Sequence, residues 1–141
     1  MCLNLYIGSS NKLPIITWND NDPQFYIYEI ENKDEISIAS DIMQLNYLYK
    51  LGSHMGCACG FSFYESEKEI EILNSKRDVM LLLKYLNNNF KDNEIKIVNI
   101  DYNTLPDDYS KIYEKNYEIN IDVSEILEFS FEENVILKII K

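Results

Sequence analysis

Apolar and polar residues alternate along several short stretches of the chain, which is the pattern of half-buried β-strands. In the first stretch, Leu3, Leu5 and Ile7 alternate with polar or aromatic neighbours up to Gly8. Later stretches are bounded by polar turn residues and are rich in β-branched and aromatic side chains. We therefore predict further strands or extended segments at 15–18, 25–31, 47–51, 57–64, 94–100 and 135–140, the last closing a hairpin with 129–131.

The strands predicted at 47–51 and 57–64 are separated only by the sequence GSHMG, residues 52–56. This length fits a hairpin connection. We therefore expect the segment 52–60 to lie at one edge of a sheet, where loops often carry functional residues.

One segment has a helical period instead. Ser75 and Asp78 have the spacing of a capping box, and an apolar stripe follows at positions 79, 82, 83, 86 and 90. The pattern predicts a main helix at about 75–89. Pro106 introduces a shorter helix at about 107–115, and 36–45 is expected to be irregular or a single helical turn.

These elements predict an α+β fold: an antiparallel-rich sheet with the main helix packed on it. A chain of 141 residues has the size of one domain, and no linker or repeat divides it, so we expect a single domain over residues 1–141.

The formal net charge is −11, from 24 acidic and 13 basic side chains. Such a charge repels phosphate backbones, so nucleic acid is not an expected partner. It suits a soluble protein, and it also allows attraction to a basic partner protein. Because the N-terminus lacks the pattern of a signal peptide and no apolar run could span a bilayer, we expect a cytoplasmic protein without membrane contact.

Side chains that can bind metals or act as nucleophiles are concentrated between Gly52 and Gly60. This segment contains the only histidine and two of the three cysteines of the chain. His54, Cys57 and Cys59 have the spacing H-x2-C-x-C, and imidazole nitrogen and thiolate sulfur are zinc ligands. Cys2 would be the fourth ligand of a Cys3His site. If one position were open, metal-bound water would make catalysis possible.

Two other interpretations of the cysteines remain open. In a strand, Cys57, Cys59, Phe61 and Phe63 would share one face, where the thiols simply extend an apolar core surface. Alternatively, Cys57 or Cys59 is a reactive thiol whose pKa is lowered by His54, which would make the protein a cysteine-based enzyme. No residue that would orient His54 is identifiable from the sequence.

The alternating glutamates of the sequence YESEKEIEI, residues 64–72, predict a solvated strand face or an exposed link into the helix.

Two stretches resemble small bacterial proteins without a known activity. They are M-C-x-N-x-Y-x-G-S at the start of the chain and G-S-H-x-G-C-x-C-G-F at residues 52–61. The resemblance covers about a seventh of the chain. It implies that Cys2 and the 52–60 segment belong together, and it implies no catalytic role.

The sequence therefore predicts a zinc-type metal site or a thiol site at 52–60, made from His54, Cys57, Cys59 and Cys2. The alternatives are an acidic module that binds a basic partner protein and a cysteine-based enzyme.

Overall fold

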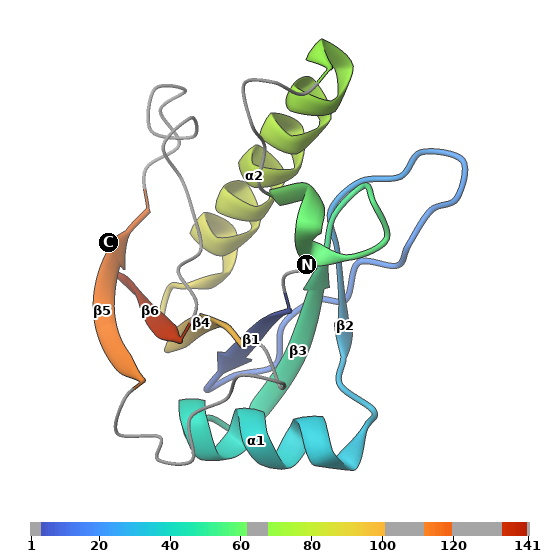
Figure 1. Ribbon diagram of the computed structural model, residues 1–141. Coiled ribbons are helices and arrows are strands. Elements are labelled where there is room, and N and C mark those ends of the chain that lie inside the picture. Colours follow the sequence, from blue (N-terminus) through green and yellow to red (C-terminus); the bar gives the residue numbers. More distant parts are fainter. Residues whose placement is uncertain (1–3, 62–67, 101–111, 120–133, 141) are drawn as a thin grey trace.

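The computed structural model describes residues 4–61, 68–100, 112–119 and 134–140 (Figure 1). Their elements, in chain order, are β1 (Leu5–Ser9), β2 (Tyr26–Glu29), α1 (Lys33–Met43), β3 (Tyr47–Gly52), the 3-10 helix η1 (Ala58–Phe61), α2 (Glu69–Asn89), β4 (Ile95–Asn99), β5 (Tyr113–Glu118) and β6 (Val135–Ile140). The strands form one sheet in the order β2-β3-β1-β4-β6-β5. Only the pair β5–β6 is parallel. The predicted α+β class with an antiparallel-rich sheet and one main helix is confirmed. The shorter helix of the structure, α1, is not the one predicted at 107–115.

The sheet is covered on both faces. β1 is central and fully buried, and its alternate residues belong to two separate apolar clusters. Leu5 and Ile7 join the cluster that contains the apolar stripe of α2, whereas Tyr6 joins the cluster that contains Ile42 and Met43 of α1. The two helices therefore pack on opposite faces, as side chains alternate across a strand (Figure 1).

The expectation of irregular structure or a single helical turn at 36–45 is wrong, because the 11-residue helix α1 occupies most of this segment. The side chain of Asn32 caps the helix by accepting hydrogen bonds from the N–H groups of Asp34 and Glu35. The helix ends at Gln44, which has a left-handed φ of 56° and donates its N–H to the carbonyl of Ser40. Capping and burial of one apolar face, which includes Ala39, Ile42 and Met43, together stabilise this helix.

The main helix is longer than predicted. α2 begins at Glu69, six residues before Ser75, which is buried within the helix and does not cap it. The glutamates at 69 and 71 lie in the first turn, where the positive end of the helix dipole favours carboxylates. Glu69 and Glu71 therefore belong to a helix start and not to a strand, and Glu65 and Glu67 lie outside the described residues.

The predicted hairpin at 47–64 is also wrong in its second half. β3 forms as expected, but its neighbours in the sheet are β1 and β2. Residues 58–61 form η1 instead of a strand, and 62–64 lie outside the described residues. The physical reason is a tight turn at Ser53, described below, that directs the chain away from the sheet.

The remaining predictions fall partly outside the described ranges. The strands at 25–31, 94–100 and 135–140 are confirmed with boundaries that differ by at most two residues, and Ile16 forms a single antiparallel bridge with Ile27. Most of the helix predicted at 107–115 lies outside the described residues, and from Tyr113 onward the chain is strand β5. The segment 129–131 also lies outside. Among the described helices, none has the length and apolar content needed to cross a membrane.

Candidate functional site

The chain turns sharply after β3 because Ser53 bonds repeatedly to its own loop. This residue is fully buried. Its N–H and its hydroxyl both donate to the carbonyl oxygen of Cys57, at 2.8 and 2.6 Å, and its Oγ accepts from the N–H of Gly60 at 3.0 Å. Gly56 completes the turn with a φ of +79°, which favours glycine. The loop is therefore closed on itself and holds His54 at a fixed place.

Gly60 has no side chain for a steric reason. A Cβ at this position would overlap Oγ of Ser53 and would lie 2.8 Å from Cε1 and 2.9 Å from Nδ1 of His54. The first turn of η1 thus packs its backbone directly against the imidazole ring. Only glycine fits without moving the ring or the serine.

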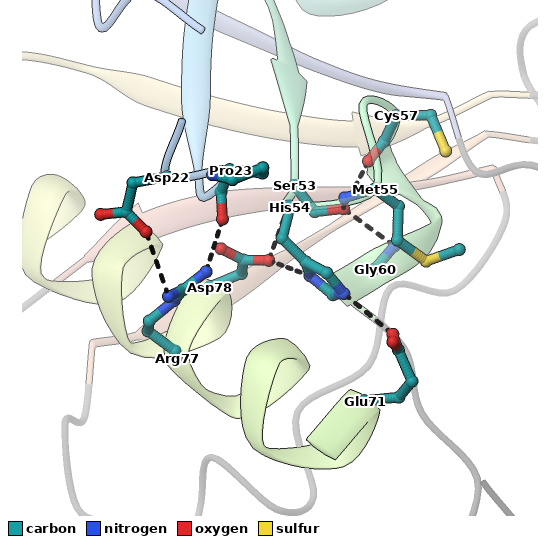
Figure 2. A network of polar contacts seen from close by, with 10 residues as sticks. All are labelled: Asp22, Pro23, Ser53, His54, Met55, Cys57, Gly60, Glu71, Arg77 and Asp78. Atoms are coloured by element: carbon teal, nitrogen blue, oxygen red, sulfur yellow. Dashed lines mark hydrogen bonds and ion pairs between the residues drawn. The ribbon is translucent and has the colours of Figure 1, made fainter. Parts of the chain in front are cut away.

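His54 is held by a buried carboxylate from α2 (Figure 2). Oδ2 of Asp78 accepts the backbone N–H of His54 at 2.8 Å and the ring Nδ1–H at 2.5 Å. The Asp78 side chain is fully buried, and that of His54 is 9% exposed. This contact fixes the tautomer, because a proton on Nδ1 leaves Nε2 to face outward. The side chain of a second residue of α2, Glu71, lies next to Nε2.

Glu71 faces the outer nitrogen of the imidazole. Its Oε2 lies 3.2 Å from Nε2 of His54, and its side chain is 47% exposed. Glu71 and Asp78 are seven residues apart, about two helical turns, so both lie on one face of α2. The result is a row of carboxylate, imidazole and carboxylate that runs from the interior to the solvent (Figure 2).

An open groove of about 270 Å³ lies beside this row, lined by Asp22, Pro23, His54, Asn74 and Arg77. The guanidinium of Arg77 donates to the carbonyl oxygen of Pro23 at 2.5 Å and lies 3.7 Å from Asp22. These contacts fasten the 19–23 loop to the helix beside the imidazole. The groove gives solvent and small ligands a route to the vicinity of His54.

The structure places the predicted site residues unequally. His54 lies at the centre of a polar network, as described above. Cys57 and Cys59 are partly buried on the same loop and, among the described residues, neither forms a disulfide. In Figure 2 the Cys57 thiol points away from the imidazole. Cys2 lies outside the described residues.

Within the described ranges, no three or more side chains of His, Cys, Asp and Glu are grouped so that they could hold a metal ion. Asp78 and Glu71 contact opposite nitrogens of His54 and so do not converge on one point. The site made from His54, Cys57, Cys59 and Cys2 stays a prediction. The strand that would have put both thiols on one core face is absent, and of this segment Ala58, Gly60 and Phe61 are buried.

Sequence reasoning missed both carboxylates. Asp78 was interpreted as part of a capping box, and Glu71 as part of a solvated strand or link. The spacing of seven between them was the available signal, because a helix that starts before residue 71 puts both on one face. Their meeting with His54 depends on the tertiary fold.

Comparisons with protein-family models, with curated proteins and with solved structures give no match to the chain.

Proposed function

We propose that the protein binds a zinc-type divalent metal ion, with Nε2 of His54 and the carboxylate of Glu71 as two of its ligands. The supporting observation is the row in which Asp78 accepts from Nδ1 while Glu71 faces Nε2. In this arrangement Asp78 does not touch the ion. A carboxylate on the far nitrogen orients a ligating imidazole and raises its basicity.

A positive charge is needed between His54 and Glu71. When the Nδ1 proton is donated to Asp78, a neutral imidazole has only a lone pair on Nε2, and a carboxylate is also only an acceptor. Two acceptors 3.2 Å apart repel each other unless a proton or a metal ion lies between them. A separation of 3.2 Å is a hydrogen-bond length for a cationic imidazole, and it is also close to the distance of about 3.3 Å between two ligands at 2.0–2.1 Å from a tetrahedral ion, so the pair accommodates either a proton or a zinc ion.

Two ligands are too few for zinc, which takes four. In this proposal the thiols predicted from the sequence supply the others. Cys57 and Cys59 lie on the loop that holds His54, and Cys2 is the remaining thiol of the chain. Because the Cys57 thiol points away from the imidazole in Figure 2, Cys57 could be a ligand only after a rearrangement of this loop.

The test is zinc content and affinity, measured on reduced protein by elemental analysis and by competition with a colorimetric chelator. We expect about one zinc per chain. His54→Ala and Glu71→Gln should abolish tight binding, and Asp78→Asn should weaken it about 10- to 100-fold. Cys57→Ser, Cys59→Ser and Cys2→Ser, made singly, identify which thiols are ligands.

The matched control is Glu69→Gln, which removes an exposed glutamate in the same first turn of α2 and should bind zinc as the wild type does. Wild-type protein that takes up no zinc, either as purified or after zinc is added, contradicts the proposal. Equal zinc affinity in the Glu69 and Glu71 variants removes Glu71 from the ligand set.

A second candidate function is a cysteine-based enzyme, which is favoured by two partly buried thiols on the loop of an oriented histidine and by the adjacent groove. It ranks second because the Cys57 thiol points away from the ring (Figure 2). If His54 activates either thiol, its alkylation should be fast below pH 8.5 and should slow in His54→Ala. Unchanged alkylation in that variant excludes this role.

A further inference from the structure

Three aromatic side chains form a row beside the sheet edge, at Trp18, Tyr26 and Tyr28; we call it the aromatic row. The rings of Tyr26 and Tyr28 are stacked with centroids 5.8 Å apart, and the Trp18 ring meets Tyr26 edge-on at 5.0 Å. Tyr28 is 39% exposed, and the other two are partly buried. The row therefore presents aromatic surface to solvent.

The row is held in place by the backbone beneath it. Tyr26 lies opposite Gly52 in the register of β2 and β3, and a Cβ on Gly52 would overlap the Tyr26 ring. The Tyr26 hydroxyl donates to the carbonyl of Gly56 at 2.7 Å. A glycine that makes room for a ring, and a hydrogen bond that anchors it, preorganise this surface and lower the entropic cost of binding.

No described element covers the row. Tyr28 of β2 and Tyr6 of β1 both pair with Lys50 of β3, so both lie on the sheet face on which α1 packs. Tyr26 pairs with Gly52 and lies on the same face. The apolar cluster under α1 includes Tyr6 but neither Tyr26 nor Tyr28, because β2 is the outermost strand on this side. Tyr26 and Tyr28 thus lie beyond the cluster that α1 closes.

The surroundings of the row are negative. Burial raises the pKa of the Tyr28 phenol, and the carboxylates of Glu35 and Glu31 raise it further. Asp20 accepts the indole N–H of Trp18 at 2.5 Å. Lys50 also lies on this face, where its ammonium and the Glu35 carboxylate form an ion pair at 3.3 Å and offset each other, so the net negative charge beside the row comes from Glu31 and Asp20. Aromatic faces rimmed by carboxylates disfavour anions and attract cations.

We propose that the aromatic row is a docking surface for a basic segment of a partner protein, whose Arg or Lys side chains lie over the rings of Tyr28 and Trp18. Charge complementarity selects this occupant, since the chain carries a net charge of −11 and the row is rimmed by acidic groups. The segment lies on the face of β2. It does not extend the sheet at Ile27, because the N–H and C=O of that residue are already bonded to Ile16. This inference does not depend on metal binding at His54.

The experiment uses the intrinsic fluorescence of Trp18, the only tryptophan in the chain, on addition of a short synthetic peptide of alternating Arg and Gly. Calorimetry supplies the affinities of variants that lack the indole. We expect saturable binding that weakens with added salt, and little binding of the same peptide with Gln in place of Arg. Because exposed cation–π contacts contribute about 0.5–1 kcal/mol, Tyr28→Ala and Trp18→Ala should each lower the affinity about two- to fivefold.

The matched control is Tyr47→Ala, which removes another exposed tyrosine, at the start of β3. It should bind the Arg peptide like the wild type, and all variants are checked for folding by circular dichroism. Equal affinity for the Arg and Gln peptides overturns the proposal. So does a folded Trp18→Ala/Tyr28→Ala double variant that binds the Arg peptide as tightly as the wild type. A neutral oligosaccharide that binds more tightly than the Arg peptide would assign the row to a different class of ligand and also overturns it.

Discussion

The carboxylate of Asp78 accepts two hydrogen bonds from His54, one from its backbone N–H and one from its imidazole Nδ1, and is itself fully buried. This contact joins residues 24 positions apart and fixes the loop after β3 against α2. It therefore has a structural effect, which is measurable without any ligand, and a chemical effect on Nε2.

Asp78→Asn should lower the free energy of unfolding by about 2 kcal/mol. Removal of the charge weakens both hydrogen bonds from His54, and hydrogen bonds to charged groups contribute about 1.5–3 kcal/mol. The measurement is urea denaturation, with Asp41→Asn, an exposed acid of α1, as the control. Similar small losses in both variants would mean that the buried contact adds little.

Two glycines of the same loop should respond differently to alanine. Gly60→Ala inserts a methyl group against Ser53 and the His54 ring and should cost about 1–3 kcal/mol, the range for overpacking. Gly56→Ala meets no atom within 4 Å, so only its φ of +79° is unfavourable, at about 1 kcal/mol.

The NMR signals of the single histidine also distinguish the two variants. Gly60→Ala should shift the imidazole resonances in NMR spectra, because the added Cβ displaces the ring, whereas Gly56→Ala should leave them near their wild-type positions. Unshifted imidazole resonances in Gly60→Ala would show that the ring does not pack on that backbone.

Asn32→Ala should destabilise the protein by about 1 kcal/mol. The Asn32 side chain accepts two N–H groups at the start of α1, and loss of such a cap typically costs this amount. Asn88→Ala, an exposed asparagine near the end of α2, is the control and should stay within about 0.5 kcal/mol of the wild type. Equal thermal midpoints for the two variants would argue against the cap.

Alkaline pH should destabilise the fold through Tyr85. Burial raises the pKa of this phenol far above its usual value of 10, and the negative charge of ionised Tyr49 raises it further. The unfolded chain ionises first, near pH 10, so the folded state then binds more protons and stability falls as the pH rises further.

The check is the free energy of unfolding between pH 8 and pH 11. Tyr85→Phe loses the hydrogen bond to the carbonyl of Pro14, so it should be less stable at pH 8, yet its stability should fall less steeply above pH 10. The same slope in both proteins would exclude Tyr85 as the source of the alkaline loss.

The sequence was informative wherever a local pattern decides the structure. Alternation, together with β-branched and aromatic residues, predicted β1, β3, β4 and β6, although the structure buries β1 on both faces. α1 was not predicted because Asn32, which caps its start, is also a residue typical of turns, so the sequence alone does not distinguish a helix start from a turn at this point. The loop after β3 was interpreted as a hairpin because its length suited one.

The site was only half predictable for the same reason. His54 was identifiable as the single histidine among glycines and cysteines, but its partners belong to α2 and are distant in sequence. Gly60 is required by the closeness of Ser53 and the imidazole, a contact that exists only after folding. Whether Cys2 and the 52–60 segment belong together, as the resemblance implies, stays a prediction.

The most direct test of the proposed metal site is the state of the two imidazole nitrogens, observed by ¹⁵N NMR of the only histidine during titration with zinc. Zinc should move the Nε2 resonance with saturation at one equivalent, while the proton stays on Nδ1 in its hydrogen bond to Asp78. A spectrum in which zinc leaves Nε2 unchanged, or displaces the proton from Nδ1, would contradict the proposed metal site.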